Sequence, residues 1–111
     1  MVPTMMSRIW RLPQEVRARY DLSSLKTLWH MAAPCPPWLK EAFIGWLGPD
    51  VIMELYDGSE SVAWTKITGR EWLGHRGSVG RVQAGEMKAF DADGNVLPPR
   101  EVGEIYMRRP K

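Results

Sequence analysis

The sequence predicts an α/β fold in which a parallel β–α–β unit is followed by a small antiparallel β part. The clearest helical spacing runs from Pro37 to Leu47, with apolar side chains on one face and Lys40 on the opposite, polar face. An apolar segment flanks this helix on each side, Leu25–Trp29 before it and Val51–Tyr56 after it. Beyond Gly85 polar and apolar residues alternate, which is the pattern of antiparallel strands.

The N-terminal part predicts two helices and a turn. Pro3–Leu12 has apolar residues at helical spacing, and Pro13–Tyr20 begins with a proline that is well tolerated in a first helical turn. Asp21–Ser24 has turn composition. These helices precede the first strand.

The nearly continuous apolar run Val51–Tyr56 predicts a strand that is covered on both faces. Two strands joined by one helix are expected to be parallel neighbours. Ligands of open α/β sheets bind beyond the carboxyl ends of such strands. The segments expected there are His30–Pro34 and Tyr56–Glu60.

The next segments predict a further strand over Val62–Ile67, a capped short helix over Thr68–Leu73 and a loop over Gly74–Gly80. None of these segments carries a complete catalytic or phosphate-binding motif.

The last part predicts a hairpin. Polar and apolar residues alternate in Glu86–Phe90 and in Gly103–Met107. The segment Asp91–Asn95 between them carries an Asp-Gly turn signal. We therefore expect an α/β part over residues 1–84 and the start of a β-rich subdomain over residues 85–111.

Composition excludes several classes of protein. The 15 basic and 13 acidic residues are scattered along the chain, which predicts a mixed solvated surface and no nucleic-acid partner. The single cysteine suits a reducing, cytoplasmic compartment, and no apolar run approaches the roughly 18 residues of a transmembrane segment.

Tyr56–Glu60 offers a phenol, a hydroxyl and two carboxylates within five residues. Glu60 is either a magnesium ligand, since Mg²⁺ takes one or two protein carboxylates, or a solvated carboxylate. Ser59 is either a phosphate donor or a turn residue. His30 either faces a substrate pocket or is structural, and Cys35 is expected to be a small packed thiol.

Six segments, in this order, resemble the adenylate-forming (AMP-binding) superfamily, specifically its acyl-CoA synthetases, or fatty-acid–CoA ligases. They are Val2–Met5, Tyr20–Leu25, His30–Pro34, Tyr56–Glu60, Gly77–Arg81 and Asp93–Tyr106. The resemblance implies part of the large N-terminal domain of an enzyme that uses ATP, Mg²⁺ and coenzyme A to convert a carboxylic acid, such as a fatty acid, to an acyl-adenylate and then to acyl-CoA.

The resemblance also implies roles for residues. Glu60 matches the magnesium-binding glutamate, and His30 lies at the acyl side of the pocket. The positions that it assigns to nucleotide binding are Ala32, Ala33, Pro34, Tyr56 and Ser59.

This sequence departs from the family pattern at positions that are usually glycine, namely Met31, Asp57, Arg100 and Arg109. Side chains at such turns are expected to strain the backbone or to fill the pocket. Segments that resemble the family's phosphate loop and its lysine-bearing C-terminal domain are not among these 111 residues. We therefore expect an internal piece of a longer synthetase that completes no catalytic cycle alone and whose partner is the remaining part of a split enzyme.

Two alternatives stay open at this point. One is a non-catalytic remnant that binds an acyl chain, a nucleotide or a partner protein through an exposed sheet edge. The other is part of an adenylation unit that feeds a carrier protein.

Overall fold

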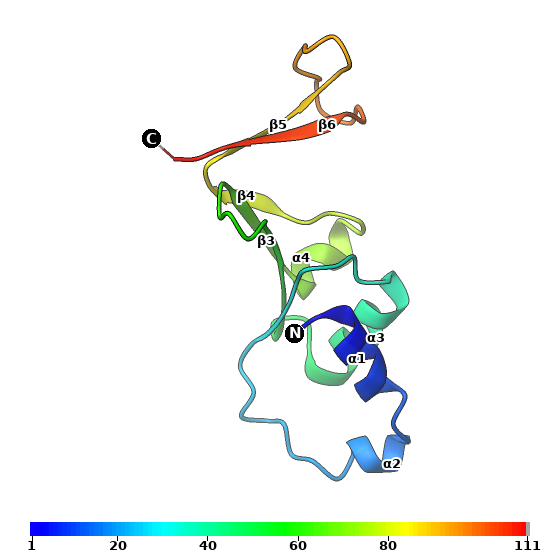
Figure 1. Ribbon diagram of the computed structural model, residues 1–111. Coiled ribbons are helices and arrows are strands. Elements are labelled where there is room, and N and C mark those ends of the chain that lie inside the picture. The colour runs from blue at the N-terminus through cyan, green and yellow to red at the C-terminus, as the bar shows by residue number, and fades with distance from the viewer. Residues whose placement is uncertain (111) are drawn as a thin grey trace.

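The structure, a computed structural model, describes residues 1–110 and confirms a mixed α/β fold (Figure 1). Its elements are α1 (Pro3–Trp10), α2 (Gln14–Arg17), β1 (Leu28–His30), α3 (Pro37–Leu47), β2 (Ile52–Tyr56), β3 (Trp64–Thr68), α4 (Gly69–Gly74), β4 (Arg81–Ala84), β5 (Glu86–Phe90) and β6 (Glu104–Arg108).

Four strands form one sheet in the order β1-β2-β3-β4. Strands β1 and β2 are parallel, with Leu28 opposite Ile52 and His30 opposite Glu54, so the predicted parallel β–α–β unit is confirmed. Strand β3 is antiparallel to β2, and β4 is antiparallel to β3. The first two strands therefore end at the same edge of the sheet.

Some predicted boundaries in the N-terminal half are wrong. The second helix was expected over Pro13–Tyr20, but α2 covers only Gln14–Arg17 and buries no residue. The first strand was expected over Leu25–Trp29, whereas β1 covers Leu28–His30. The chain from residue 18 to residue 27 is exposed. Neither element extends into this segment, because no tertiary packing stabilises regular structure there.

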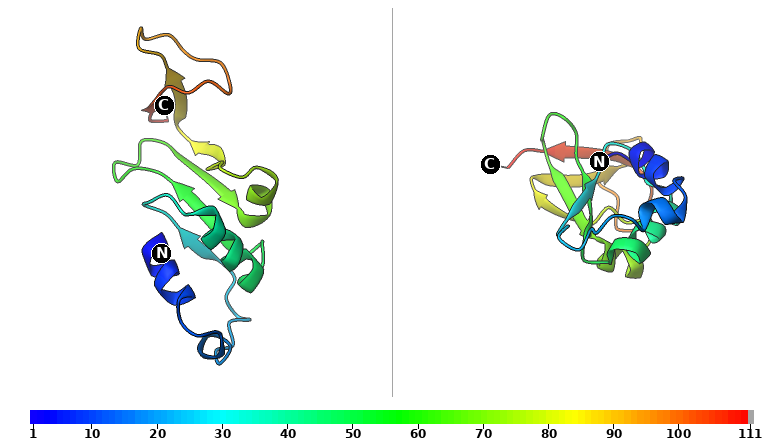
Figure 2. Two further views of the ribbon diagram at one scale, coloured as in Figure 1. Left: turned by 90° about the vertical axis from the view of Figure 1, so that its right-hand side faces the viewer. Right: turned by 90° about the horizontal axis from the view of Figure 1, so that it is seen from below.

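The core lies between α1, α3, α4 and one face of the sheet. Its buried apolar residues are Met6, Leu39, Phe43, Ile44, Ile52, Ile67 and Trp72. The helices gather on one side of the sheet (Figure 2). The expectation that β2 is covered on both faces is therefore wrong for the described chain, because only Ile52 of this strand is buried and its other residues are half-buried.

The chain changes sheets at Gly85, which lies between β4 and β5 with φ 78°. A Cβ atom here would lie 2.6 Å from Cβ of Ala63 and from the carbonyl oxygen of Arg108, so the crossing requires glycine. Strands β5 and β6 form a separate antiparallel pair at the far end of the molecule (Figure 1). The division into residues 1–84 and 85–111 stays a prediction.

The predicted Asp91–Asn95 turn is confirmed. The backbone N–H of Asp91 donates to the carbonyl oxygen of Asn95 at 3.0 Å, and Phe90 pairs with Val96 across the turn. The chain then continues as a loop before β6 begins at Glu104. Among residues 1–110, no helix is long and apolar enough to cross a bilayer.

Helix α4 begins with a side-chain cap, as predicted. The hydroxyl oxygen of Thr68 accepts a hydrogen bond from the backbone N–H of Glu71 at 3.1 Å and donates to the Glu71 carboxylate at 3.0 Å. This reciprocal arrangement satisfies a backbone donor that the first helical turn otherwise leaves free. The cap holds the start of the helix that carries the buried Trp72.

We expect Thr68→Ala to lower the free energy of unfolding by about 1 kcal/mol, because the capping hydrogen bond is lost. Urea denaturation followed by circular dichroism measures this change. Thr27→Ala is the matched control, since Thr27 is exposed and lies in a loop. Equal effects of the two substitutions would show that the cap contributes nothing.

Candidate functional site

A cavity of about 450 Å³ lies at the carboxyl ends of β1 and β2. Five segments line it: the loop after β1, the start of α3, the end of β2, helix α4 and the loop before β4. The lining residues are Ala32, Ala33, Pro34, Cys35, Pro37, Glu54, Leu55, Tyr56, Asp57, Trp72, Gly77, Ser78 and Val79. The structure thus brings together Ala32, Ala33, Pro34 and Tyr56, four of the five positions expected to bind nucleotide.

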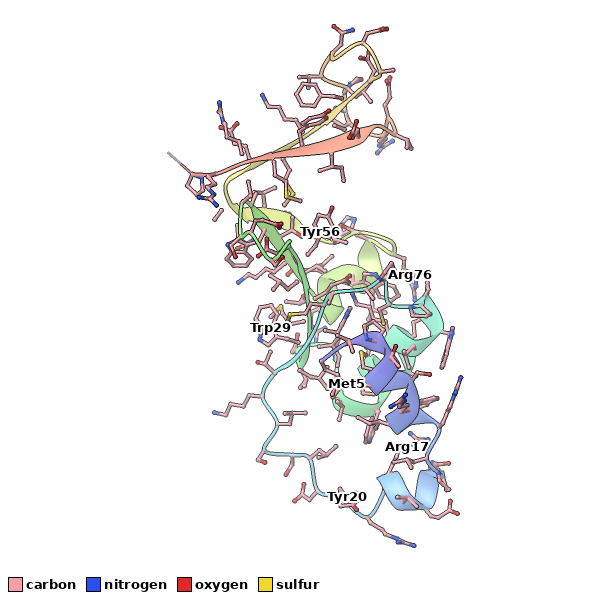
Figure 3. The ribbon with its side chains drawn as sticks, in the orientation of Figure 1. Met5, Arg17, Tyr20, Trp29, Tyr56 and Arg76 are labelled. Carbon is pink, nitrogen blue, oxygen red and sulfur yellow. The ribbon has the colours of Figure 1, made fainter. Side chains whose placement is uncertain are left out.

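Tyr56 lies well away from the helical end of the molecule that Met5, Arg17 and Tyr20 mark (Figure 3). Ser59 and Glu60 follow Tyr56 in the chain, are exposed, and do not line the cavity. Residues 1–110 contain no group of three or more His, Cys, Asp or Glu side chains that would hold a metal ion. Glu60 therefore offers one solvent-facing carboxylate, which fits an ion that keeps most of its water.

Most of the positions that are usually glycine in the family pattern show no backbone strain in this structure. Met31, Asp57 and Arg109 do not adopt positive φ, so the backbone is not strained at these three residues. Asp57 instead lines the cavity, which was the other outcome expected for such a position. Arg100 does, with φ 75°, as a position suited to glycine predicts. Among the non-glycine residues of the cavity wall, Ala32 is left-handed, with φ 73°. In the turn after β1 the strained residue is thus Ala32, one position after Met31, where strain was expected.

Two hydrogen bonds that involve backbone atoms of the Gly77–Gly80 loop hold this loop in place. The Thr65 hydroxyl donates to the carbonyl oxygen of Val79 at 2.6 Å, and the backbone N–H of Gly80 donates to the Ser78 hydroxyl oxygen at 3.0 Å. Gly80 has φ 92° and lies too close to the backbone of Lys66 to carry a side chain. The loop therefore holds Ser78 and Val79 against the cavity.

A buried ion pair lies behind the cavity. Lys40 of α3 is only 1% exposed and donates a hydrogen bond to Oε2 of Glu54 in β2. The expectation that Lys40 lies on a polar, solvent-facing side of its helix is wrong, because the carboxylate of Glu54 holds it in the interior. Sequence reasoning missed both residues, and the available signal was one acidic residue inside an otherwise apolar strand.

Trp72 makes cation–π contacts with two basic residues. Nζ of Lys40 lies 4.9 Å from its ring centroid, and the guanidinium carbon of Arg76 lies 5.5 Å away. Nε of Arg76 also donates to Oε1 of Glu41 in α3 at 2.8 Å. These two cation–π contacts restrict the orientation of the indole that lines the cavity.

His30 is fully buried beside the ion pair and does not line the cavity. Its Nε2 lies 3.8 Å from Oε2 of Glu54, and within residues 1–110 neither ring nitrogen has a hydrogen-bond partner. Burial lowers the pKa of His30 to about 4, and the charge of Lys40 acts in the same direction while Glu54 opposes it. The imidazole is therefore neutral at neutral pH, and its expected place at the acyl side of the pocket stays a prediction.

Cys35 lines the cavity as a free, half-buried thiol that packs against the core, in line with the expected small packed thiol. Burial raises the pKa of Cys35 to about 11. The protonated thiol is a weak nucleophile, so Cys35 contributes a soft, neutral wall.

The charges around the cavity limit what it can bind. Glu54 and Asp57 are the acidic lining residues, and no basic side chain belongs to the lining within the described chain. Because Lys40 neutralises Glu54, the charge that disfavours a phosphate group here is that of Asp57. Leu55, Tyr56 and Trp72 offer apolar and aromatic surface to an uncharged group.

A model of the AMP-binding enzyme family matches residues 1–111. The chain belongs to this family. The amide bond synthetase McbA from Marinactinospora thermotolerans is 28% identical, with a TM-score of 0.84, and the match covers 99% of this chain and 22% of that one. This chain therefore spans less than a quarter of that enzyme's length.

Two further structures show the same fold at lower identity. The N-terminal domain of FACL13 from Mycobacterium tuberculosis, bound to an inhibitor, is 19% identical with a TM-score of 0.69, and the match covers 98% of this chain and 27% of that one. The A-PCP structure of McyG, complexed with phenylalanyl-adenylate, is 20% identical with a TM-score of 0.73, and the match covers 94% and 18% of the two chains.

We expect Lys40→Met to lower the free energy of unfolding by about 3 kcal/mol, because it leaves Glu54 mostly buried without its cation. The double variant Lys40→Met, Glu54→Gln removes both charges and is expected to recover part of that loss. Guanidinium denaturation of both variants measures the difference. A double variant no more stable than Lys40→Met would contradict the pairing.

Lowering the pH is expected to destabilise the chain through His30. The pKa of His30 is about 4 in the folded chain and 6.5 without burial, so between these values the unfolded chain binds the proton more tightly. The free energy of unfolding is therefore not reduced by His30 above about pH 6.5. It falls as the pH drops toward 4, by on the order of 3 kcal/mol at most.

The measurement is the pH dependence of unfolding for the wild type, His30→Leu and His75→Leu. We expect His30→Leu to flatten the slope between pH 6.5 and 4. His75→Leu, at an exposed position, is the matched control for the removal of one imidazole. A slope that survives in His30→Leu would assign the acid sensitivity to the carboxylates.

Proposed function

We propose that this chain forms part of the acid- and nucleotide-binding site of an ATP-dependent acyl-CoA synthetase. The observation that carries the proposal is the cavity itself, where Ala32–Pro34 and Tyr56 meet at the ends of two parallel strands. This is the edge at which open α/β sheets bind ligands. Membership of the AMP-binding enzyme family implies the use of ATP.

In this proposal the adenine stacks near Tyr56 and borders Ala32, Ala33 and Pro34. The phosphates lie outside the cavity, since Asp57 opposes negative charge at its lining. Ser59 donates to the α-phosphate, and Glu60 binds Mg²⁺ together with phosphate oxygens and water. The ion supplies positive charge that stabilises the phosphate as a carboxylate attacks it. The exposure of Ser59 and Glu60 supports these roles.

The acid is proposed to be hydrophobic, a fatty acid or a similar compound, because Cys35, Leu55 and Trp72 offer it apolar walls. The acceptor is proposed to be the thiol of coenzyme A. The 28% identity to an amide bond synthetase favours a second candidate, in which an amine receives the acyl group. The likeness to an A-PCP structure adds a carrier-protein thiol as a third acceptor.

We further propose that the 111 residues bind ligands without completing turnover, and that they act together with the remaining part of a synthetase. Segments resembling the family's phosphate loop and catalytic lysine are not among them. A cytoplasmic location is proposed as well, because a single cysteine forms no disulfide within the chain.

Titration with Mg²⁺–ATP, followed by tryptophan fluorescence, tests nucleotide binding, since Trp72 lines the cavity. We expect Tyr56→Ala to weaken binding about tenfold, because stacking of a base on an aromatic ring stabilises a complex by roughly 1–3 kcal/mol. Tyr20→Ala is the matched control, as Tyr20 is exposed and remote from the cavity.

Trp72→Phe identifies which part of the fluorescence change comes from the cavity. Equal binding by the Tyr56→Ala and Tyr20→Ala variants would contradict the proposed position of the base. ATP–pyrophosphate exchange by the purified chain tests the remaining point, and robust exchange would show that these residues turn over alone.

A further inference from the structure

Strand β1 is an edge strand of the four-stranded sheet, with β2 on one side of it. The backbone N–H of Leu28 donates to the carbonyl oxygen of Val51 at 2.8 Å, so Leu28 directs its backbone polar groups toward β2. The backbone groups of Thr27 and Trp29 therefore point to the open side. Within residues 1–110 the backbone of Thr27 makes no hydrogen bond to other backbone groups. Such an edge is a template for another strand.

Met1 already occupies one position on the open side of β1. Its backbone nitrogen donates to the carbonyl oxygen of Trp29 at 2.7 Å, and the backbone N–H of Met31 donates to the carbonyl oxygen of Met1 at 3.1 Å. This is the hydrogen-bond pattern of a parallel pair in which Met1 lies opposite His30. The edge of β1 thus accepts a parallel neighbour.

An apolar groove of about 420 Å³ lies beside this edge, between helices α1 and α3 and the segment that leads from α2 into β1. This segment runs along the outside of the molecule (Figure 1). Within the described chain no acidic side chain lines the groove, and its one basic residue, Arg17, stacks on Trp10 with 3.8 Å between the guanidinium carbon and the ring centroid. Met1 and Leu28 both line the groove, so side chains of the sheet edge enter it.

The groove and the open edge together fit an extended segment. Met1 directs its backbone groups to β1 and its side chain to the groove. In a strand that follows the same register, every second residue does the same, because side chains alternate between the two faces of a sheet. Those residues are therefore expected to be apolar. A helix or a small apolar molecule in the groove leaves the backbone groups of the edge without partners.

We propose that the β1 edge and the adjoining groove form a docking surface for an extended segment of a partner polypeptide, apolar at every second residue and parallel to β1. This proposal rests on the proposed action of the chain with the remaining part of a synthetase, and not on ligand binding in the cavity. The chain covers 22% of a related enzyme, so the remainder of a synthetase is long enough to supply such a strand. Backbone hydrogen bonds give affinity in this mode of recognition, and the alternate side chains give specificity.

The probe is a synthetic peptide, acetyl-KVTVSVK-amide, which carries valine at every second position. Isothermal titration calorimetry measures its binding to the purified chain, and tryptophan fluorescence follows the groove, which Trp46 lines. The peptide acetyl-KVVVTSK-amide has the same composition without the alternation. We expect it to bind about tenfold more weakly, because fewer of its apolar side chains enter the groove.

Two N-methylated forms of the alternating peptide test its pairing with β1. Methylation of the valine nitrogens removes the N–H groups that face the edge, and we expect it to weaken binding about tenfold or more, because hydrogen bonds are lost. Methylation of the threonine and serine nitrogens removes N–H groups that face away from β1. This second form is the matched control and is expected to keep most of the affinity.

Two variants of the chain test the groove. Leu25 and Leu73 are 36% and 37% exposed, and of the two only Leu25 lines the groove. We expect Leu25→Glu to weaken peptide binding about tenfold or more, because the bound peptide desolvates the new carboxylate. Leu73→Glu is the matched control and is expected to bind as the wild type does. Circular dichroism verifies that both variants fold.

Several outcomes would overturn the proposal. Failure of the alternating peptide to bind does so, as does equal binding by the two N-methylated forms or by the two variants. A dimer in sedimentation equilibrium that Leu25→Glu dissociates, together with no peptide binding, assigns the groove to a second copy of the chain instead. Binding of ATP without binding of the peptide overturns this inference alone. Binding of the peptide without binding of ATP supports this inference and contradicts the proposed function of the cavity.

Discussion

The ion pair between Lys40 and Glu54 joins helix α3 to strand β2 directly behind the cavity. Two charges in the interior stabilise a fold only when each has its partner, because desolvation opposes them. The pair therefore fixes how α3 is rotated against the sheet. That rotation in turn places the ammonium of Lys40 over Trp72, whose ring forms one wall of the cavity.

The site combines buried residues next to the cavity with exposed residues outside it. His30 is neutral and enclosed beside the charged pair. At the rim, Ser59 and Glu60 remain exposed and follow the end of a strand. The cavity thus has a largely apolar lining with polar groups outside it, as many small-molecule sites do.

Local signals predicted much of the fold and part of the site. Residues Ala32–Pro34 and Tyr56 were expected at one sheet edge, since parallel strands end together, and the structure brings them to one cavity. Glu54 and Lys40 were not expected in the site. Neither belongs to a motif, and their contact depends on the packing of a helix onto a strand 14 residues away in the chain.

The sequence by itself determined helix α3, because Pro37 can begin a helix and Gly48, with φ 101°, ends it. It also determined the parallel pairing of β1 with β2, which a single connecting helix requires. Only the tertiary structure decided that Lys40 is buried and that His30 lies outside the cavity lining. Side-chain polarity gives an average preference for solvent, whereas a specific carboxylate in the interior reverses it for one residue.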